Sequence, residues 1–195
     1  MNLSPPILIF LAFAVYGLVH SFLASNIAKD FSKLFFGKAS DRFYRIFYNA
    51  FSFIAIIPIL AMPVALPDKP MYTIPQPWNY LALVLQIIGL IGAAASVMHT
   101  GAFEFIGLSQ ALGIKSKSGL VTGGLYKYIR HPIYTFSILF IWATPAMSYN
   151  LAALYLSFTL YFIVGALFEE RKLVKAYGEE YLEYKSRTPM LIPFL

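Results

Sequence analysis

Long apolar runs constrain this chain more than any other feature of its sequence. They cover residues 5–24, 46–66, 79–98, 132–147 and 151–168. A helix of roughly 20 apolar residues crosses a hydrocarbon core of about 30 Å. Hydrophobic residues make up 59% of the chain and charged residues only 12%, whereas soluble domains carry about 25% charged residues. The sequence therefore predicts an all-α, polytopic transmembrane bundle of about five spans, organised as a single domain over residues 1–195.

The basic residues predict how the spans are oriented. Fourteen of the fifteen Lys and Arg residues lie after the first, third and fifth runs, and only Lys69 lies on the other side. The positive-inside rule then places the N-terminus outside and the C-terminus in the cytoplasm. The net charge of +6 accordingly indicates orientation and anionic lipid head groups rather than nucleic acid. The first residues lack the basic stretch of a cleavable signal peptide, so we expect the first run to be a retained span.

Two further features of the sequence limit the kinds of site and of tail that we expect. The chain has no cysteine, which excludes disulfides, thiolate metal sites and a cysteine nucleophile, and no metal site is expected. The stretch 169–186 after the last run has apolar side chains near helical spacing with charges between them, which predicts an amphipathic helix at the cytoplasmic face. These apolar positions are Leu173, Val174, Tyr177, Tyr181 and Tyr184.

Two remote segments should meet in the folded chain. Pro132 favours the first position of a helix, and only residues 148–150 separate the fourth run from the fifth. The two spans then form an antiparallel hairpin, which brings Arg130 and His131 towards Glu169 and Glu170. Such a corner suits a ligand that carries both signs of charge. The same residues could also be ordinary basic flanks and solvated glutamates, because charges commonly border membrane spans.

The motifs in these segments resemble a known superfamily. The chain reads Arg130-His131-Pro132-Ile133-Tyr134, then Glu169-Glu170, then YGEEYLEY over residues 177–184 and PMLIP over residues 189–193. This order and spacing resemble the superfamily of isoprenylcysteine carboxyl methyltransferases and phospholipid methyltransferases. Residues 103–108, 142–148 and 169–171 are similar to its methanethiol S-methyltransferase branch. His20-Ser21 and residues 44–49 are similar to that branch and to NnrU-type membrane proteins.

The resemblance implies an enzyme that uses S-adenosyl-L-methionine as its cofactor. The expected reaction is methyl transfer to a small, methanethiol-like thiol or another lipophilic acceptor, at the cytoplasmic face. Residues 1–99 would supply three spans, and residues 100–195 the cofactor-binding loop, the hairpin and the tail. The implied cofactor-binding residues are Gly124, Leu125, Tyr126, Arg130, His131, Tyr134, Glu169 and Glu170. The implied catalytic residues are His131, Glu170 and Arg171, with His20 and His99 as further candidates for substrate contact.

The resemblance leaves three alternatives open. The acceptor could be a prenylcysteine carboxylate or a phospholipid amine, and an NnrU-like protein would have no enzymatic activity. The sequence also leaves open which of Glu169 and Glu170 holds the cofactor and which group removes a proton from a thiol. Besides the acceptor, the expected partners are membrane lipids, and no nucleic acid is expected.

Overall fold

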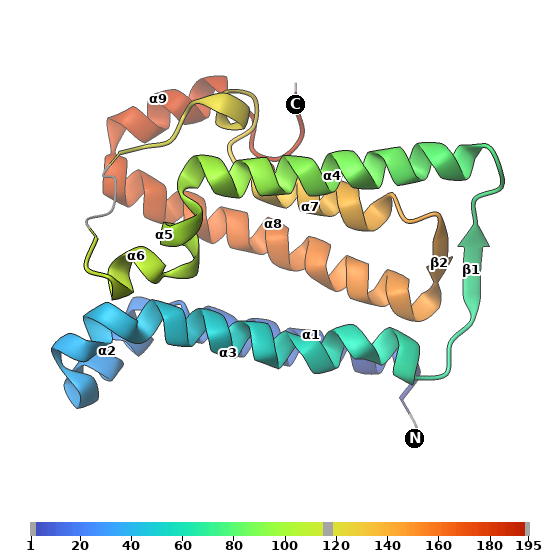
Figure 1. The fold of residues 1–195 in the computed structure, drawn as a ribbon, viewed down its shortest axis with the longest axis horizontal. Coiled ribbons are helices and arrows are strands. Elements are labelled where there is room, and N and C mark those ends of the chain that lie inside the picture. Colours follow the sequence, from blue (N-terminus) through green and yellow to red (C-terminus); the bar gives the residue numbers. More distant parts are fainter. Residues whose placement is uncertain (1–2, 115–118, 194–195) are drawn as a thin grey trace. The chain divides into compact units, whose positions relative to one another are not determined.

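The computed structural model describes residues 3–114 and 119–193 of the chain, and these residues are mainly helical (Figure 1). Lys115 and Lys117, two of the cations used to predict orientation, lie outside the described residues. The elements, in chain order, are α1 (Pro5–Leu23), α2 (Asn26–Phe36), α3 (Lys38–Ala65), β1 (Pro70–Thr73), α4 (Trp78–Thr100), α5 (Ala102–Ile106), α6 (Leu108–Ala111), the 3-10 helix η1 (Gly124–Lys127), α7 (Pro132–Trp142), β2 (Ala146–Ser148), α8 (Tyr149–Tyr177) and α9 (Glu179–Arg187).

Four of these helices, α1, α3, α4 and α8, are long and apolar enough to cross a membrane. Large apolar side chains cover their outer surfaces, as at Leu18, Val64 and Ile91. Such a surface is stable against lipid, and a helix satisfies its own backbone hydrogen bonds there. With α7 as a shorter apolar helix, the prediction of a polytopic helical membrane bundle is confirmed.

The expected fourth span differs most from the structure. The apolar run 132–147 predicts a helix throughout, but α7 ends at Trp142 after 11 residues, roughly 16 Å of helix. Pro145 has no N–H to donate and disfavours a helical conformation at Thr144. The chain then forms β2, which pairs with β1. The apolar run thus consists of a short helix followed by an extended segment.

The second span and the tail also have different bounds from those expected. α3 begins at Lys38, before the apolar run at residue 46, so its first two turns are basic. The expected tail helix over 169–186 is two pieces: α8 continues to Tyr177, and α9 begins after Gly178. Gly178 has a φ of 56°, which glycine adopts without steric cost and which ends the α-helical path.

The chain forms two compact units. The first comprises Met1–Lys69, Gly101–Lys117 and Ser148–Ser157, and the second comprises Pro70–Thr100, Ser118–Met147 and Phe158–Leu195. In the second unit α4 lies along α7 (Figure 1). A side chain at Gly89 would come within 2.7 Å of the Phe140 backbone nitrogen. Small residues therefore let these two helices pack closely, as is common between membrane helices.

Candidate functional site

The start of α7 is held in place by a later part of the chain. His131 precedes the helix and Pro132 is its first residue. The backbone N–H groups of Arg130 and His131 donate to the carbonyls of Pro189 and Met190, at 2.9 and 3.1 Å. The segment after α9 therefore fixes the backbone from which the Arg130 and His131 side chains project.

A buried carboxylate, Glu170, lies at the centre of the site. Its Oε1 accepts from Arg130 Nε at 2.6 Å and from the Tyr181 hydroxyl at 3.0 Å, and lies 3.3 Å from His131 Nε2. Its Oε2 lies 2.7 Å from Lys185 Nζ. Glu170 is only 4% exposed. These five residues, Arg130, His131, Glu170, Tyr181 and Lys185, are referred to below as the Glu170 cluster.

The Arg130 side chain also has several hydrogen-bond partners within the protein. Besides Glu170, its Nη1 donates to the carbonyl of Lys185 at 3.1 Å and to that of Thr188. Its side chain is 8% exposed. A guanidinium has five N–H donors, and most of those of Arg130 are directed at protein oxygens. This geometry favours a role for Arg130 in holding the surrounding chain over direct contact with a cofactor.

The neighbouring carboxylate, Glu169, is in a different environment. Its side chain is 49% exposed, and its Oε2 lies 3.5 Å from His131 Nδ1. The Tyr134 hydroxyl donates to the same oxygen at 3.1 Å. The Tyr134 ring stacks between those of His131 and Phe162, at centroid distances of 5.6 and 5.2 Å. Glu169 is thus oriented by two neighbours and keeps one oxygen, Oε1, to which no described hydrogen bond or ion pair is made.

Three buried tyrosines, Tyr126, Tyr181 and Tyr184, also contribute to the structure of the site. The Tyr184 hydroxyl donates to the backbone carbonyl of Tyr126 in η1, so α9 holds the loop ahead of α7. Burial raises the pKa of Tyr126 and of Tyr184 to about 12, and burial also raises the pKa of Tyr181, whose hydroxyl faces Glu170. All three hydroxyls therefore remain protonated at neutral pH, and those of Tyr181 and Tyr184 donate to Glu170 and to the Tyr126 carbonyl.

The 3-10 helix η1 exposes backbone next to His99. Gly124 has a φ of 60° and is exposed, Leu125 is half-buried and Tyr126 is buried. A Cβ at Gly124 would collide with the His99 ring, and His99 Nδ1 lies 3.1 Å from the carbonyl of Ala95. Gly124 is therefore required both for its backbone conformation and for the close approach of His99.

Two candidate residues are not members of this cluster. Arg171 is exposed, and its guanidinium lies over the Phe168 ring at 5.4 Å from the centroid. His20 belongs to the first unit, where its Nε2 lies 2.7 Å from the Tyr48 hydroxyl oxygen. In the structure His131 meets both glutamates, as the predicted hairpin implies, but the hairpin does not predict the residues that support them. Tyr181 and Tyr184 belong to a stretch that carries the resemblance and Lys185 to the basic residues used for orientation, but none of them, nor Thr188, is predicted as a site residue.

The arrangement fits the amino-acid end of an S-adenosylmethionine molecule. An oriented, half-exposed carboxylate suits an ammonium group, because a charge-assisted hydrogen bond is short and strong. The exposed backbone at Gly123 leaves room for a ligand, since a Cβ there would meet nothing within 4 Å. These features lie within 50 residues of each other in sequence and all belong to the second unit.

Comparisons with known proteins cover this region. Residues 78–180 match the family model of phospholipid methyltransferases. Methanethiol S-methyltransferase 1 of Bradyrhizobium diazoefficiens is 29% identical over 94% of this chain and 65% of the relative. Methanethiol S-methyltransferase of Crocosphaera subtropica is 34% identical over 60% of this chain and 51% of the relative. Human protein-S-isoprenylcysteine O-methyltransferase is 37% identical over 39% of this chain and 28% of the relative.

The chain thus spans less than two thirds of the length of these curated relatives. No solved structure matches it. The family model covers more than half of the chain, including His99, the segment from Gly124 to Tyr134 and both glutamates. The resemblance carried by the motifs is therefore confirmed, and the chain belongs to the phospholipid methyltransferase family.

Proposed function

We propose that this protein is a membrane methyltransferase that uses S-adenosyl-L-methionine, with a small thiol as its favoured acceptor. The observation that carries the proposal is the pair of adjacent carboxylates in unlike environments: Glu170 is buried and bonded on both oxygens, whereas Glu169 is oriented and half exposed. A ligand site is expected to combine a rigid, fully hydrogen-bonded group, here Glu170, with a neighbouring group that a ligand can reach, here Glu169.

We infer separate roles for the two glutamates. Glu169 would hold the ammonium group of the cofactor, with Tyr134 and His131 fixing the direction of its carboxylate. Glu170 would act as a positioning residue, since its oxygens are occupied by Arg130 and Lys185. The exposed backbone of η1, from Gly124 to Tyr126, would line the rest of the cofactor pocket.

When bound, the cofactor supplies an already activated methyl group, so the protein contributes mainly position. A thiol acceptor must also lose its proton, because the thiolate is the nucleophile. Both ring nitrogens of His131 face carboxylates, at 3.5 and 3.3 Å. This favours His131 as a donor that orients Glu169 over His131 as the group that accepts the thiol proton. Arg171, exposed on the same helix, would face the acceptor.

The names of the relatives guide the choice of acceptor. Two of the relatives described above are methanethiol S-methyltransferases, and their alignments cover 94% and 60% of the chain. The human isoprenylcysteine methyltransferase aligns with 39% of the chain, which keeps a prenylcysteine carboxylate as the second candidate. The family description keeps a phospholipid amine as a third. We place the active site at the cytoplasmic face of a single methyltransferase domain, with the N-terminus outside.

Titration calorimetry of the detergent-solubilised protein with S-adenosylmethionine and its demethylated product tests the proposal. We expect binding at micromolar concentration and a higher midpoint of thermal unfolding, since a ligand of the native state must stabilise it. If millimolar ligand produces no heat of binding and no thermal stabilisation, the result would favour a non-enzymatic, NnrU-like protein. A panel of methanethiol, a prenylcysteine and phosphatidylethanolamine then identifies the acceptor. Reporter fusions at both ends test the orientation.

A further inference from the structure

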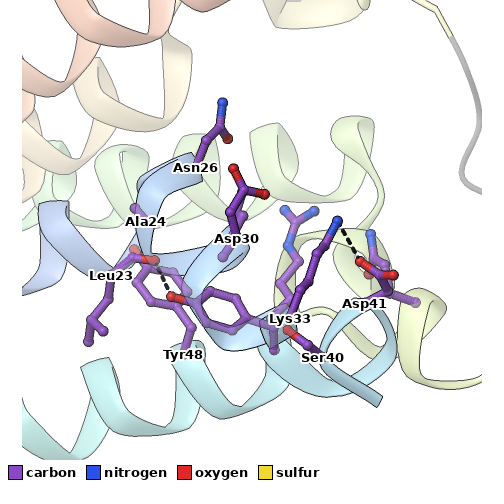
Figure 2. A pocket seen from close by; sticks show the side chains of 12 residues that line it. Leu23, Ala24, Asn26, Asp30, Lys33, Ser40, Asp41 and Tyr48 are labelled. Carbon is purple, nitrogen blue, oxygen red and sulfur yellow. Dashed lines mark hydrogen bonds and ion pairs between the residues drawn. The ribbon is translucent and has the colours of Figure 1, made fainter. Parts of the chain in front are cut away.

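A cavity of about 510 Å³ lies in the first unit, where α1 ends and α3 begins (Figure 2). Hydrogen bonds fix the antiparallel register of these helices: the Tyr44 hydroxyl donates to the Leu23 carbonyl at 2.6 Å, and the Tyr48 hydroxyl oxygen lies 2.7 Å from His20 Nε2. Leu23 is the last residue of α1 and lines the cavity. Because α1 has 19 residues, roughly the thickness of the hydrocarbon core, the cavity lies at the depth of lipid head groups.

The wall of the cavity carries a small excess of positive charge. Lys29, Lys33 and Arg45 line it together with Asp30 and Asp41. Lys33 Nζ lies 2.8 Å from Asp41 Oδ1, a pair drawn with a dashed line in Figure 2. Three cations against two carboxylates leave one net positive charge. A phosphodiester carries one negative charge, so the charge of the wall complements that of a phosphodiester.

Arg45 is the cation best placed to bind such a group. Its Cβ and Cγ lie against Gly107, where a side chain would come within 2.9 Å of them. The stem is therefore held, while the guanidinium makes no hydrogen bond or ion pair with any other described residue. A guanidinium presents a planar fork of donors that matches phosphate oxygens.

The helix beside the cavity, α2, presents an apolar face. It has 11 residues, roughly 16 Å and too short to cross a bilayer. Ile27, Phe31 and Leu34 are 73%, 62% and 81% exposed, whereas the neighbouring Ala28 is buried. A short helix with one strongly apolar face and Lys on its polar face lies in the plane of the membrane interface. Figure 2 shows Asp30 and Lys33 of this helix at the cavity.

We propose that this cavity binds the phosphate of an anionic phospholipid, whose acyl chains lie along the apolar face of α2. The cations of the cavity contact the phosphate, and Ile27, Phe31 and Leu34 contact the chains. A free phosphate would use only the first of these two surfaces, so the combination favours a lipid. The site is independent of the methyl transfer proposed above and uses none of its residues.

The test measures lipid binding by native mass spectrometry of the delipidated, detergent-solubilised protein. The probes are dioleoyl phosphatidylglycerol and dioleoyl phosphatidylcholine, which share acyl chains and differ in net charge. We expect the wild type to prefer phosphatidylglycerol. Arg45→Gln should weaken phosphatidylglycerol binding about tenfold, the scale of a lost hydrogen bond between charged groups. The matched control Lys38→Gln removes the same charge from an exposed residue that does not line the cavity, and should change binding less than twofold.

Three outcomes would overturn the proposal: equal affinity for the two lipids, wild-type binding by Arg45→Gln, or equal losses in Arg45→Gln and Lys38→Gln. Affinity for soluble glycerol 3-phosphate equal to that for phosphatidylglycerol would overturn the lipid assignment. Gln retains the Cβ and Cγ that lie against Gly107. If Arg45→Gln nevertheless lowers the thermal midpoint without lipid, Lys29→Gln replaces it, with the same expected loss. S-adenosylhomocysteine binding, measured in the same samples, should be unchanged, so failure of either proposal is recognised separately.

Discussion

The two units handle their charges differently. In the Glu170 cluster of the second unit, Arg130 and Glu170 are less than a tenth exposed and each has several protein partners. At the cavity of the first unit, Lys33 and Asp41 are 49% and 61% exposed and form a single pair. Burial makes a charge costly unless it is fully bonded, whereas an exposed pair contributes little. The first arrangement stabilises the fold, and the second leaves charges available to a ligand.

Removing the carboxylate of Glu170 tests this difference between the two units most directly. Glu170→Ala leaves the buried guanidinium of Arg130 without its ion-pair partner, and such a loss costs about 3–5 kcal/mol. We expect the free energy of unfolding, measured by titration with a denaturing detergent, to fall by that amount. Glu183→Ala is the matched control, because Glu183 pairs with Arg187 at an exposed position of α9. A fall as small as that of the control would contradict the buried-network interpretation.

The adjacent glutamate should separate binding from stability. Glu169→Gln keeps the shape of the side chain and removes its charge, so we expect the dissociation constant for S-adenosylhomocysteine to rise roughly ten- to a hundredfold, the scale of 1.5–3 kcal/mol. The free energy of unfolding should change little, since the side chain is half exposed. Calorimetry and the detergent titration on one preparation measure both. Wild-type binding would reject Glu169 as the cofactor ligand.

The link between α9 and η1 should have a smaller effect. Tyr184→Phe removes the donor to the Tyr126 carbonyl and leaves a buried acceptor unsatisfied, which costs about 1–3 kcal/mol. The detergent titration measures this loss, with Tyr177→Phe as control because Tyr177 is only half-buried and its hydrogen bond, at 3.4 Å, is long. Equal losses in the two variants would show that the Tyr184 bond contributes nothing specific.

The same tyrosines predict an alkaline limit. The pKa of Tyr126 and of Tyr184 is raised from 10.0 to about 12 in the folded protein, chiefly by burial. A pKa raised by folding gives stability that is complete below the unfolded value and is lost as pH rises through the folded value. The free energy of unfolding should therefore fall between about pH 10 and pH 12, and fall less in Tyr184→Phe. Tyrosinate absorbance followed in parallel would identify the titrating groups, and a pH-independent stability in this range would contradict the assignment.

The smallest effect is expected in the first unit. Lys33→Gln removes the exposed pair with Asp41, and we expect no measurable change in the midpoint of thermal unfolding, at low or at high salt. Solvent and salt screen such pairs, and many contribute nothing to stability. A destabilisation comparable to that of Glu170→Ala would remove the contrast between the two units.

The sequence predicts which residues meet at the site, but it does not predict which of the two glutamates is buried. The apolar runs and Pro132 suffice to bring His131 to the end of the last span. They cannot rank Glu169 against Glu170, because adjacent helical residues point in directions about 100° apart and the partners decide which is buried. Two of the partners that enclose Glu170, Tyr181 and Lys185, come from α9, whose start depends on Gly178. Likewise, hydropathy alone does not reveal that α7 stops ahead of Pro145.

Arg130 is made 40 residues before Glu170, and this interval has a consequence for biogenesis. When α7 first enters the membrane, α8 and α9 are not yet packed against it, so Glu170 does not yet neutralise Arg130. During insertion Arg130 is therefore an uncompensated cation, able to retain that end of α7 on the side of synthesis. Once α8 and α9 are in place, the same guanidinium is enclosed and its charge no longer acts on the surroundings. We therefore expect Arg130 to favour one orientation of α7 during insertion and to stabilise the finished protein afterwards.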